Sequence, residues 1–187
     1  AKKKHSNLYK YEKFLSKKYK IKVTQNYSNI LNWTINNSNK FWSSIWDFAK
    51  VKGIKKEKSY VSKILFKSKF LTNSKLNFAE NLLSKNDNTK AITFISENGY
   101  REIRSWKNLN LNVNKITNFL KKNKIKENDR VAAYLPNLIE TVEAFIATTS
   151  IGAIWSSCSP DFGVDGVIER FAQIKPKLLL IADRYYY

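Results

Sequence analysis

The stretch Val131-Ala-Ala-Tyr-Leu135 is a short apolar run, and it opens the part of the sequence that decides the fold. We predict a buried strand there, a helix over residues 138–149 and a second strand over residues 153–157. Apolar residues at every third or fourth position indicate a second helix over residues 164–174. We predict a third strand over residues 178–182. This β-α-β-α-β order predicts an α/β fold with a parallel sheet.

Upstream of this region, the sequence predicts a β-hairpin over residues 91–104. Asn98-Gly99 is a two-residue turn signal between two runs of strand-forming residues. Ser105 can then cap a helix. The apolar residues of this helix are spaced to lie on one face: Leu109, Val113, Ile116 and Leu120.

The N-terminal part has an aromatic helical stripe between Phe41 and Ala49, which we expect to face a core. Ser38 could cap this helix and Gly53 could end it. We also expect a short extended segment near residues 64–66 and a helical turn at residues 78–83. A mainly helical region therefore precedes the hairpin and the sheet.

The composition is that of a globular protein, because 43% of the residues are hydrophobic. The sequence has no run of 18 apolar residues and no signal peptide, so we expect no membrane partner. Cys158 is the only cysteine, which excludes an internal disulfide and fits a cytoplasmic location.

The formal net charge is +19, and most of the surplus lies in residues 1–90. One interpretation is a basic surface that binds nucleic acid or an anionic membrane. The other is a compositional bias, because Lys outnumbers Arg 29 to 5, and arginine is the side chain that forks onto phosphates and bases. We favour the bias and expect no nucleic-acid partner.

In a parallel sheet, ligands bind beyond the carboxyl ends of the strands, where we expect three loops. They comprise residues 136–137, 156–163 and 183–187, and the second loop is the most polar. Its serines and Asp161 precede a helix whose backbone N–H groups could receive an anion. Alternatively, Asp161 only caps this helix and Pro160 suits its entry. The spacing alone favours the cap.

The sequence contains no catalytic constellation of a familiar kind. His5 is the only histidine, so no Ser-His or Cys-His pair can form. Cys158 is expected to be a small packed residue. Glycine-rich phosphate motifs and metal-ligating clusters are absent from the sequence, so we assign no catalytic and no metal-binding residue.

Four strings of the sequence resemble one known family. Two of them are Asp129-Arg-Val-Ala-Ala-Tyr-Leu-Pro-Asn137 and Ser150-Ile-Gly-Ala-Ile-Trp-Ser-Ser-Cys-Ser-Pro-Asp-Phe-Gly163. Both are similar to acetoacetyl-CoA synthetases, a family of adenylate-forming acyl-CoA synthetases, and the second string is the more specific. Leu76-Asn-Phe-Ala-Glu-Asn-Leu-Leu83 and Phe41-Trp-Ser-Ser-Ile-Trp-Asp-Phe48 are similar to upstream segments of the same family.

The resemblance implies an acetoacetate–CoA ligase that uses ATP, Mg²⁺ and CoA. It also implies that residues 1–90 are an N-terminal cap region and that residues 91–187 begin the AMP-binding domain. In related enzymes the loop that matches Ser159, Pro160 and Asp161 approaches CoA, so these three are candidate cofactor-binding residues. The ATP-binding and catalytic motifs of the family lie further along, so we expect an N-terminal fragment that is inactive by itself.

Two alternatives remain open at this point. Within the enzyme class, the alternative is another short-chain acyl-CoA synthetase, for acetate or propionate. Outside that class, the alternative is the basic nucleic-acid-binding module. A salt series separates this second alternative from an enzyme, because binding carried by lysine–phosphate contacts depends steeply on ionic strength.

We predict that the basic N-terminal half is a solvated surface and not a nucleic-acid site, so that any binding of nucleic acid is weak and disappears at physiological salt. Lysines on a solvated surface attract phosphates by charge alone, and released counterions make such binding salt-dependent. Filter binding over a salt series measures the effect. Tight, sequence-selective binding at physiological salt would contradict the prediction.

Overall fold

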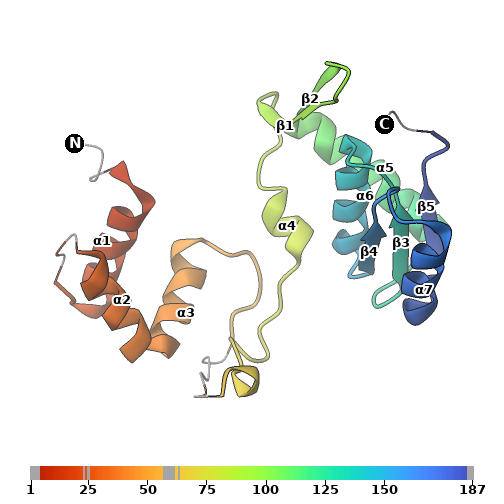
Figure 1. The fold of residues 1–187 in the computed structure, drawn as a ribbon. Coiled ribbons are helices and arrows are strands. Elements are labelled where there is room, and N and C mark those ends of the chain that lie inside the picture. Colours follow the sequence, from red (N-terminus) through yellow and green to blue (C-terminus); the bar gives the residue numbers. More distant parts are fainter. Residues whose placement is uncertain (1–4, 23, 25, 57–61, 63, 185–187) are drawn as a thin grey trace. The chain divides into compact units, whose positions relative to one another are not determined.

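The computed structural model describes residues 5–22, 24, 26–56, 62 and 64–184. The chain forms two compact units, Ala1–Leu76 and Asn77–Tyr187 (Figure 1). The first unit is mainly helical, and the second contains the hairpin and the parallel sheet.

Three helices of the first unit pack around a small core. Tyr11 and Leu15 reach this core from the first helix, and Ile30 reaches it from the second. Ser6 and Asn26 cap these two helices by accepting hydrogen bonds from first-turn N–H groups. The third helix confirms the predicted aromatic stripe, whereas the sequence pattern predicts neither of the other two. The helices are α1 (Asn7–Tyr19), α2 (Tyr27–Asn36) and α3 (Ser38–Phe48).

The two predicted ends of α3 are wrong. Ser38 is the first residue of the helix, and the preceding Asn37 makes no side-chain cap hydrogen bond. Asn37 alone separates α2 from α3, and its side-chain amide donates back to the Trp33 carbonyl at 3.1 Å. At the other end, α3 stops at Phe48, five residues before Gly53.

Gly53 serves a different purpose, because it lies where the chain passes close to Lys75. Its φ is +153°, and a Cβ atom at this position would lie 2.4 Å from the Lys75 carbonyl oxygen. The extended segment predicted near residues 64–66 is also wrong. A 3-10 turn, η2 (Leu65–Lys67), forms there because the Lys67 N–H donates to the carbonyl three residues earlier, at 2.9 Å.

The start of the second unit follows the sequence prediction closely. The hairpin is antiparallel, and Gly99 in its turn has a φ of +83°, which glycine adopts without strain. Ser105 caps the long helix by accepting a hydrogen bond from the Asn108 N–H. The elements are α4 (Phe78–Leu82), β1 (Lys90–Ile95), β2 (Arg101–Ser105) and α5 (Trp106–Lys122).

The rest of the second unit is a three-stranded parallel sheet with two connecting helices. The strand order is β4-β3-β5, so the first strand along the chain is the central one. The α/β fold and the β-α-β-α-β order are therefore confirmed. The elements are β3 (Arg130–Tyr134), α6 (Ile139–Ser150), β4 (Ile154–Cys158), α7 (Val164–Ile174) and β5 (Leu178–Ile181).

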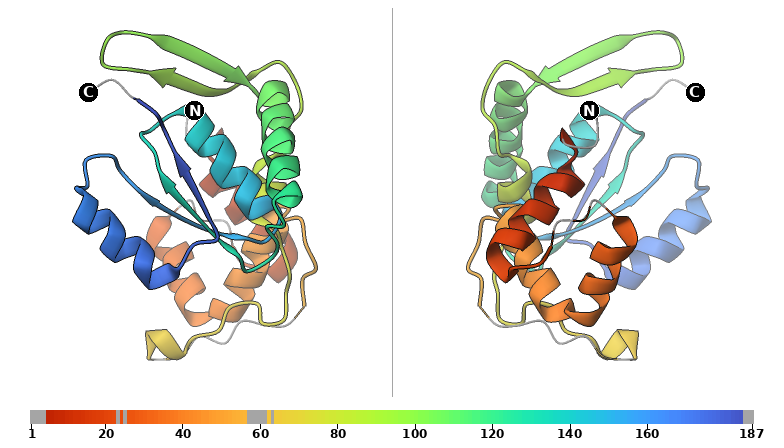
Figure 2. Two further views of the ribbon diagram at one scale, coloured as in Figure 1. Left: turned by 90° about the vertical axis from the view of Figure 1, so that its right-hand side faces the viewer. Right: turned by 90° about the vertical axis from the view of Figure 1, so that its left-hand side faces the viewer.

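The two connecting helices cover opposite faces of this sheet (Figure 2). Val131 of β3 belongs to the core that α5 and α6 form with one face. Its neighbour Ala132 packs on the other face with Phe171 of α7 and with Cys158. Residues 131–133 are completely buried, and the two alanines among them leave room for helices to approach closely.

An ion pair joins the amino ends of β3 and β5. Lys177 Nζ lies 2.8 Å from Asp129 Oδ2, and the Lys177 N–H donates to the Arg130 carbonyl at 2.8 Å. The hydrogen bond from Lys177, together with a backbone hydrogen bond from Lys126, holds the pKa of Asp129 below its usual value. These contacts support the register of β5 against β3.

We predict that Leu120→Ala lowers the free energy of unfolding by about 2–5 kcal/mol, because a buried leucine side chain leaves a cavity. Leu120 is fully buried in α5, whereas Leu111 on the same helix is 52% exposed. The matched control Leu111→Ala should change stability by less than about 0.5 kcal/mol. Urea denaturation of both variants measures the difference, and equal losses would contradict the assignment of this core.

Candidate functional site

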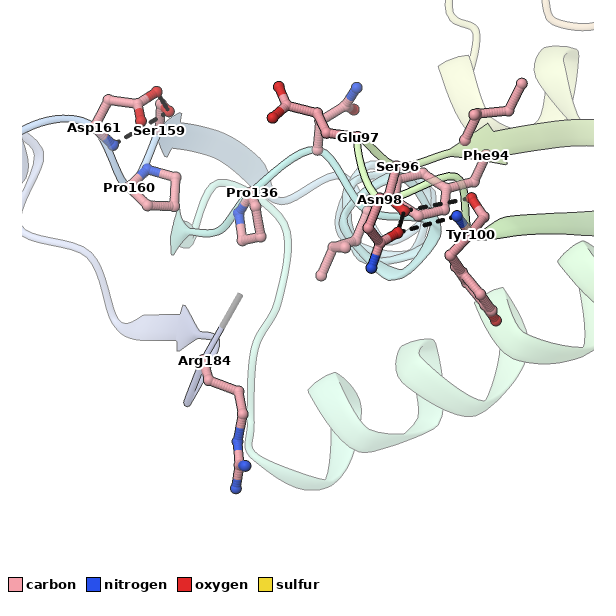
Figure 3. Close-up of a pocket in the computed structure, with 13 residues that line it drawn as sticks. Phe94, Ser96, Glu97, Asn98, Tyr100, Pro136, Ser159, Pro160, Asp161 and Arg184 are labelled. Carbon is pink, nitrogen blue, oxygen red and sulfur yellow. Dashed lines mark hydrogen bonds between the residues drawn. The ribbon is translucent and has the colours of Figure 1, made fainter. Parts of the chain in front are cut away.

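The second unit has an open pocket of about 960 Å³ beyond the carboxyl ends of its parallel strands. Four segments line it: the hairpin turn, residues 136–138, residues 159–161 and Arg184. Figure 3 shows the side chains of the hairpin turn on one side, Ser159 and Asp161 on the other, and Pro136 between them. A pocket of this size is large enough for much of a nucleotide-sized ligand.

The strand order explains why the pocket forms here. The chain runs from the central strand β3 to β4 on one side of it. It then crosses the sheet and forms β5 on the other side of β3. Such a switch in direction opens a crevice between the carboxyl ends of adjacent strands, where open α/β sheets bind ligands. Residues 136–138 follow β3 and Arg184 follows β5, so the crevice is part of the pocket.

The structure brings all three predicted loops to this edge. Residues 136–137, 159–161 and Arg184 come from the first, second and third loop and line the same pocket. Residues 185–187 of the third loop lie outside the described residues. Ser156 and Ser157 belong to β4, where they pair with β3, so the second loop begins later than the sequence suggested.

Tyr134, the last residue of β3, holds the second loop in place. Its hydroxyl lies 2.8 Å from the Pro160 carbonyl oxygen and 2.9 Å from the Phe162 carbonyl oxygen, and it can donate to either. Within the loop, the Ser159 hydroxyl donates to the Asp161 carboxylate, and the Phe162 N–H donates to the Ser159 carbonyl at 3.1 Å. The loop is therefore a closed turn anchored to the central strand.

This turn corrects the predicted roles of Asp161 and Pro160. The cap position of α7 is Gly163, which makes no side-chain cap hydrogen bond. Asp161 lies two residues before this cap position, and its carboxylate accepts from Ser159 within the turn. Pro160 precedes the first helical residue, Val164, by four positions, so it does not form the helix entry.

Two helix amino termini follow the loops that line the pocket, and neither has a side-chain cap. Leu138 occupies the cap position of α6 and Gly163 that of α7. The N–H groups of such a terminus and its positive dipole end favour an anion. The charged residues that line the pocket are Glu97, Asp161 and Arg184, so its own charge is mixed.

The hairpin turn is the part of the site that the sequence did not reveal. The hairpin itself was predicted, but its position over the edge of the sheet depends on contacts with distant elements. Cys158 is buried beside Ala132 and Phe171, which confirms that it is a packed residue. Within the described part of the chain, no group of three potential metal ligands occurs.

We predict that Tyr134→Phe loosens residues 159–163 without disrupting the sheet. The variant loses the hydroxyl that donates to one of the two carbonyl groups, and the loss of this hydrogen bond costs about 1 kcal/mol of stability. Hydrogen exchange should become faster in residues 159–163 and stay unchanged in β4. Tyr27, which is 64% exposed in the first unit, provides the control Tyr27→Phe. Unchanged exchange in the loop of Tyr134→Phe would refute the anchoring role.

The chain resembles known proteins along most of its length. The model of a family described as AMP-binding enzyme matches residues 79–186. Acetoacetyl-coenzyme A synthetase of Rhizobium meliloti (strain 1021) is 41% identical over 156 residues, which are 83% of this chain and 24% of that protein. Acetoacetyl-CoA synthetase of Xenopus tropicalis is 40% identical over 171 residues, which are 87% of this chain and 25% of that protein.

A solved structure has the same fold. Acetoacetyl-CoA synthetase from Streptomyces lividans superimposes with a TM-score of 0.90 at 24% identity, over 99% of this chain and 29% of that chain. The predicted resemblance to acetoacetyl-CoA synthetases is thus confirmed, and this chain spans about a quarter of the length of the curated relatives it matches. Among the described residues, no helix is both long and apolar enough to cross a membrane. Because the family model matches more than half of the residues, the chain belongs to the family of AMP-binding enzymes.

Proposed function

We propose that this chain is part of an acetoacetate–CoA ligase. The observation that carries the proposal is the similarity to proteins named acetoacetyl-CoA synthetase, which extends over 83% and 87% of the chain. In the first step, acetoacetate and ATP would give acetoacetyl-adenylate and pyrophosphate. In the second step, the thiol of CoA would displace AMP and form acetoacetyl-CoA.

Each step has a clear chemical purpose. A carboxylate is a poor acyl donor, and attaching AMP to it creates a good leaving group for attack by a thiol. Mg²⁺, which commonly binds the phosphates of nucleotide substrates, would neutralise charge on ATP in the first step. The described residues contribute no nucleophile or general base to this scheme, so their part is to bind and orient.

We assign the pocket at the edge of the sheet to the CoA side of this reaction. Ser159, Pro160 and Asp161 are the proposed contact residues, and Arg184 offers a guanidinium that suits a phosphate. The uncapped amino termini of α6 and α7 add N–H groups for an anionic ligand. Asp161 would repel a phosphate, and its role here is to hold the turn through Ser159.

The proposal also covers domain organisation and location. Residues 1–90 would form the N-terminal cap region, and residues 91–187 would begin the AMP-binding domain. The family match starts at residue 79 and the second compact unit starts at Asn77, so both support a boundary in this part of the chain, about a dozen residues before residue 91. A cytoplasmic location, where a lone cysteine stays reduced, fits an enzyme that uses small soluble substrates.

The test separates the two half-reactions in the full-length enzyme that contains this chain. We predict that Ser159→Trp raises the KM for CoA about tenfold, because bulk at the pocket wall displaces the ligand. Pyrophosphate exchange with acetoacetate and ATP should stay within about twofold of the parent enzyme. Ser84→Trp is the control, since Ser84 is exposed in the same unit and does not line the pocket.

Two outcomes would refute parts of this proposal. If pyrophosphate exchange fails in Ser159→Trp while thioester formation from ready-made adenylate is normal, the loop serves the adenylation step instead. If the parent enzyme supports pyrophosphate exchange with acetate or propionate and not with acetoacetate, it is another short-chain acyl-CoA synthetase.

A further inference from the structure

Four charged side chains from β2 and α6 form a cluster. Arg104 is at its centre, with Nη2 3.0 Å from Glu102 Oε1 and 3.3 Å from Glu140 Oε1. Arg104 Nε lies 2.9 Å from Glu143 Oε1, as an ion pair without the alignment of a hydrogen bond. From α5, the Asn112 amide donates to the same oxygen of Glu143 at 3.0 Å. Three carboxylates thus share one guanidinium.

The pair of Arg104 and Glu143 is the buried part of this cluster. The side chain of Glu143 is 3% exposed and that of Arg104 is 17% exposed, whereas that of Glu140 is 62% exposed. Burial raises the pKa of Glu143 above that of an ordinary glutamate. A buried charge without its partner is strongly unfavourable, so the pair resists separation far more than an exposed pair does.

The ion pair joins β2 to α6, and each of these elements follows a segment that lines the pocket. The hairpin turn precedes β2, and residues 136–138 precede α6. β2 begins directly after the hairpin turn, in which the Ser96 N–H donates to the Tyr100 carbonyl at 2.9 Å. The Tyr100 hydroxyl also donates to Glu102 Oε2 at 3.3 Å, which ties the turn to the cluster. On α6, the Thr141 hydroxyl donates to the Pro136 carbonyl at 2.8 Å and holds the other wall.

We propose that Arg104 is a positioning residue for CoA binding: by joining β2 to the first two turns of α6, it fixes the hairpin turn against residues 136–138. This inference rests on the CoA assignment of the pocket proposed above. Arg104 itself does not line the pocket, so it acts through the position of the walls and not through contact with the ligand.

The experiment uses the full-length enzyme and removes the buried pair as a whole. Arg104→Met alone would leave Glu143 buried without its cation and could prevent folding. The double variant Arg104→Met/Glu143→Leu replaces both charges by apolar groups of similar size, which buried ion pairs commonly tolerate. Arg101→Met is the matched control, because Arg101 is an exposed arginine on the same strand.

Two quantities are measured for each variant. The first is hydrogen exchange in residues 96–100, which should become faster in the double variant and stay unchanged in Arg101→Met. The second is the KM for CoA in thioester formation, which should rise about tenfold while pyrophosphate exchange stays within about twofold. A residue that only stabilises the fold would not produce this separation of the half-reactions.

The outcomes distinguish this inference from the proposed function. If exchange in residues 96–100 is unchanged in the folded double variant, Arg104 does not position the turn and the inference is overturned. It is also overturned if exchange rises but the KM for CoA stays normal while Ser159→Trp raises it. If neither variant changes the KM for CoA, the assignment of the pocket to CoA fails and the inference fails with it.

Discussion

The parallel pairing of β3 with a neighbour on each side is the constraint on which the second unit depends. In the parallel sheet, β3 comes first along the chain and lies in the centre, so the chain must cross β3 to reach β5. The connecting helices α6 and α7 therefore lie on opposite faces. The completely buried segment 131–133 can sit between helices on both faces because two of its residues are alanines. The pocket is a consequence of this arrangement, since the loops after all three strands meet at one edge.

Much of the second unit could be predicted because its sequence pattern is local. The helices α5 and α7 repeat apolar residues at helical spacing, and the turn at Asn98-Gly99 marks the hairpin directly. The helices α1 and α2 escaped prediction because their few core residues, such as Leu15 and Ile30, are diluted by lysine and asparagine. Cap residues were harder, because Asp161 has a competing partner within its own turn and Ser38, which was expected to cap α3, is already the first residue of that helix.

The site could be predicted only in outline, for a similar reason. Strand ends follow from the strand pattern, so Ser159, Pro160 and Asp161 were expected at the ligand-binding edge. The anchoring of their loop by Tyr134 joins residues 26 positions apart, and the ion pair between Arg104 and Glu143 joins residues 39 positions apart. Contacts of this kind depend on how whole elements pack, and no periodic pattern in the sequence encodes them.

The charges of the pocket suggest how it would discriminate between ligands. Among the described residues that line it, Glu97 and Asp161 oppose the one cation Arg184, so simple attraction of an anion is weak there despite the +19 charge of the chain. In the first unit, by contrast, Asp47 pairs with two lysines. Burial alone would raise the pKa of Asp47, but hydrogen bonds from Lys18 and Lys55 outweigh the effect of burial and lower this pKa. With weak attraction, an anionic ligand must rely on backbone N–H groups at fixed positions, whose strength falls off steeply with misalignment. Recognition at this pocket would therefore depend on the spacing of its walls more than on its charge.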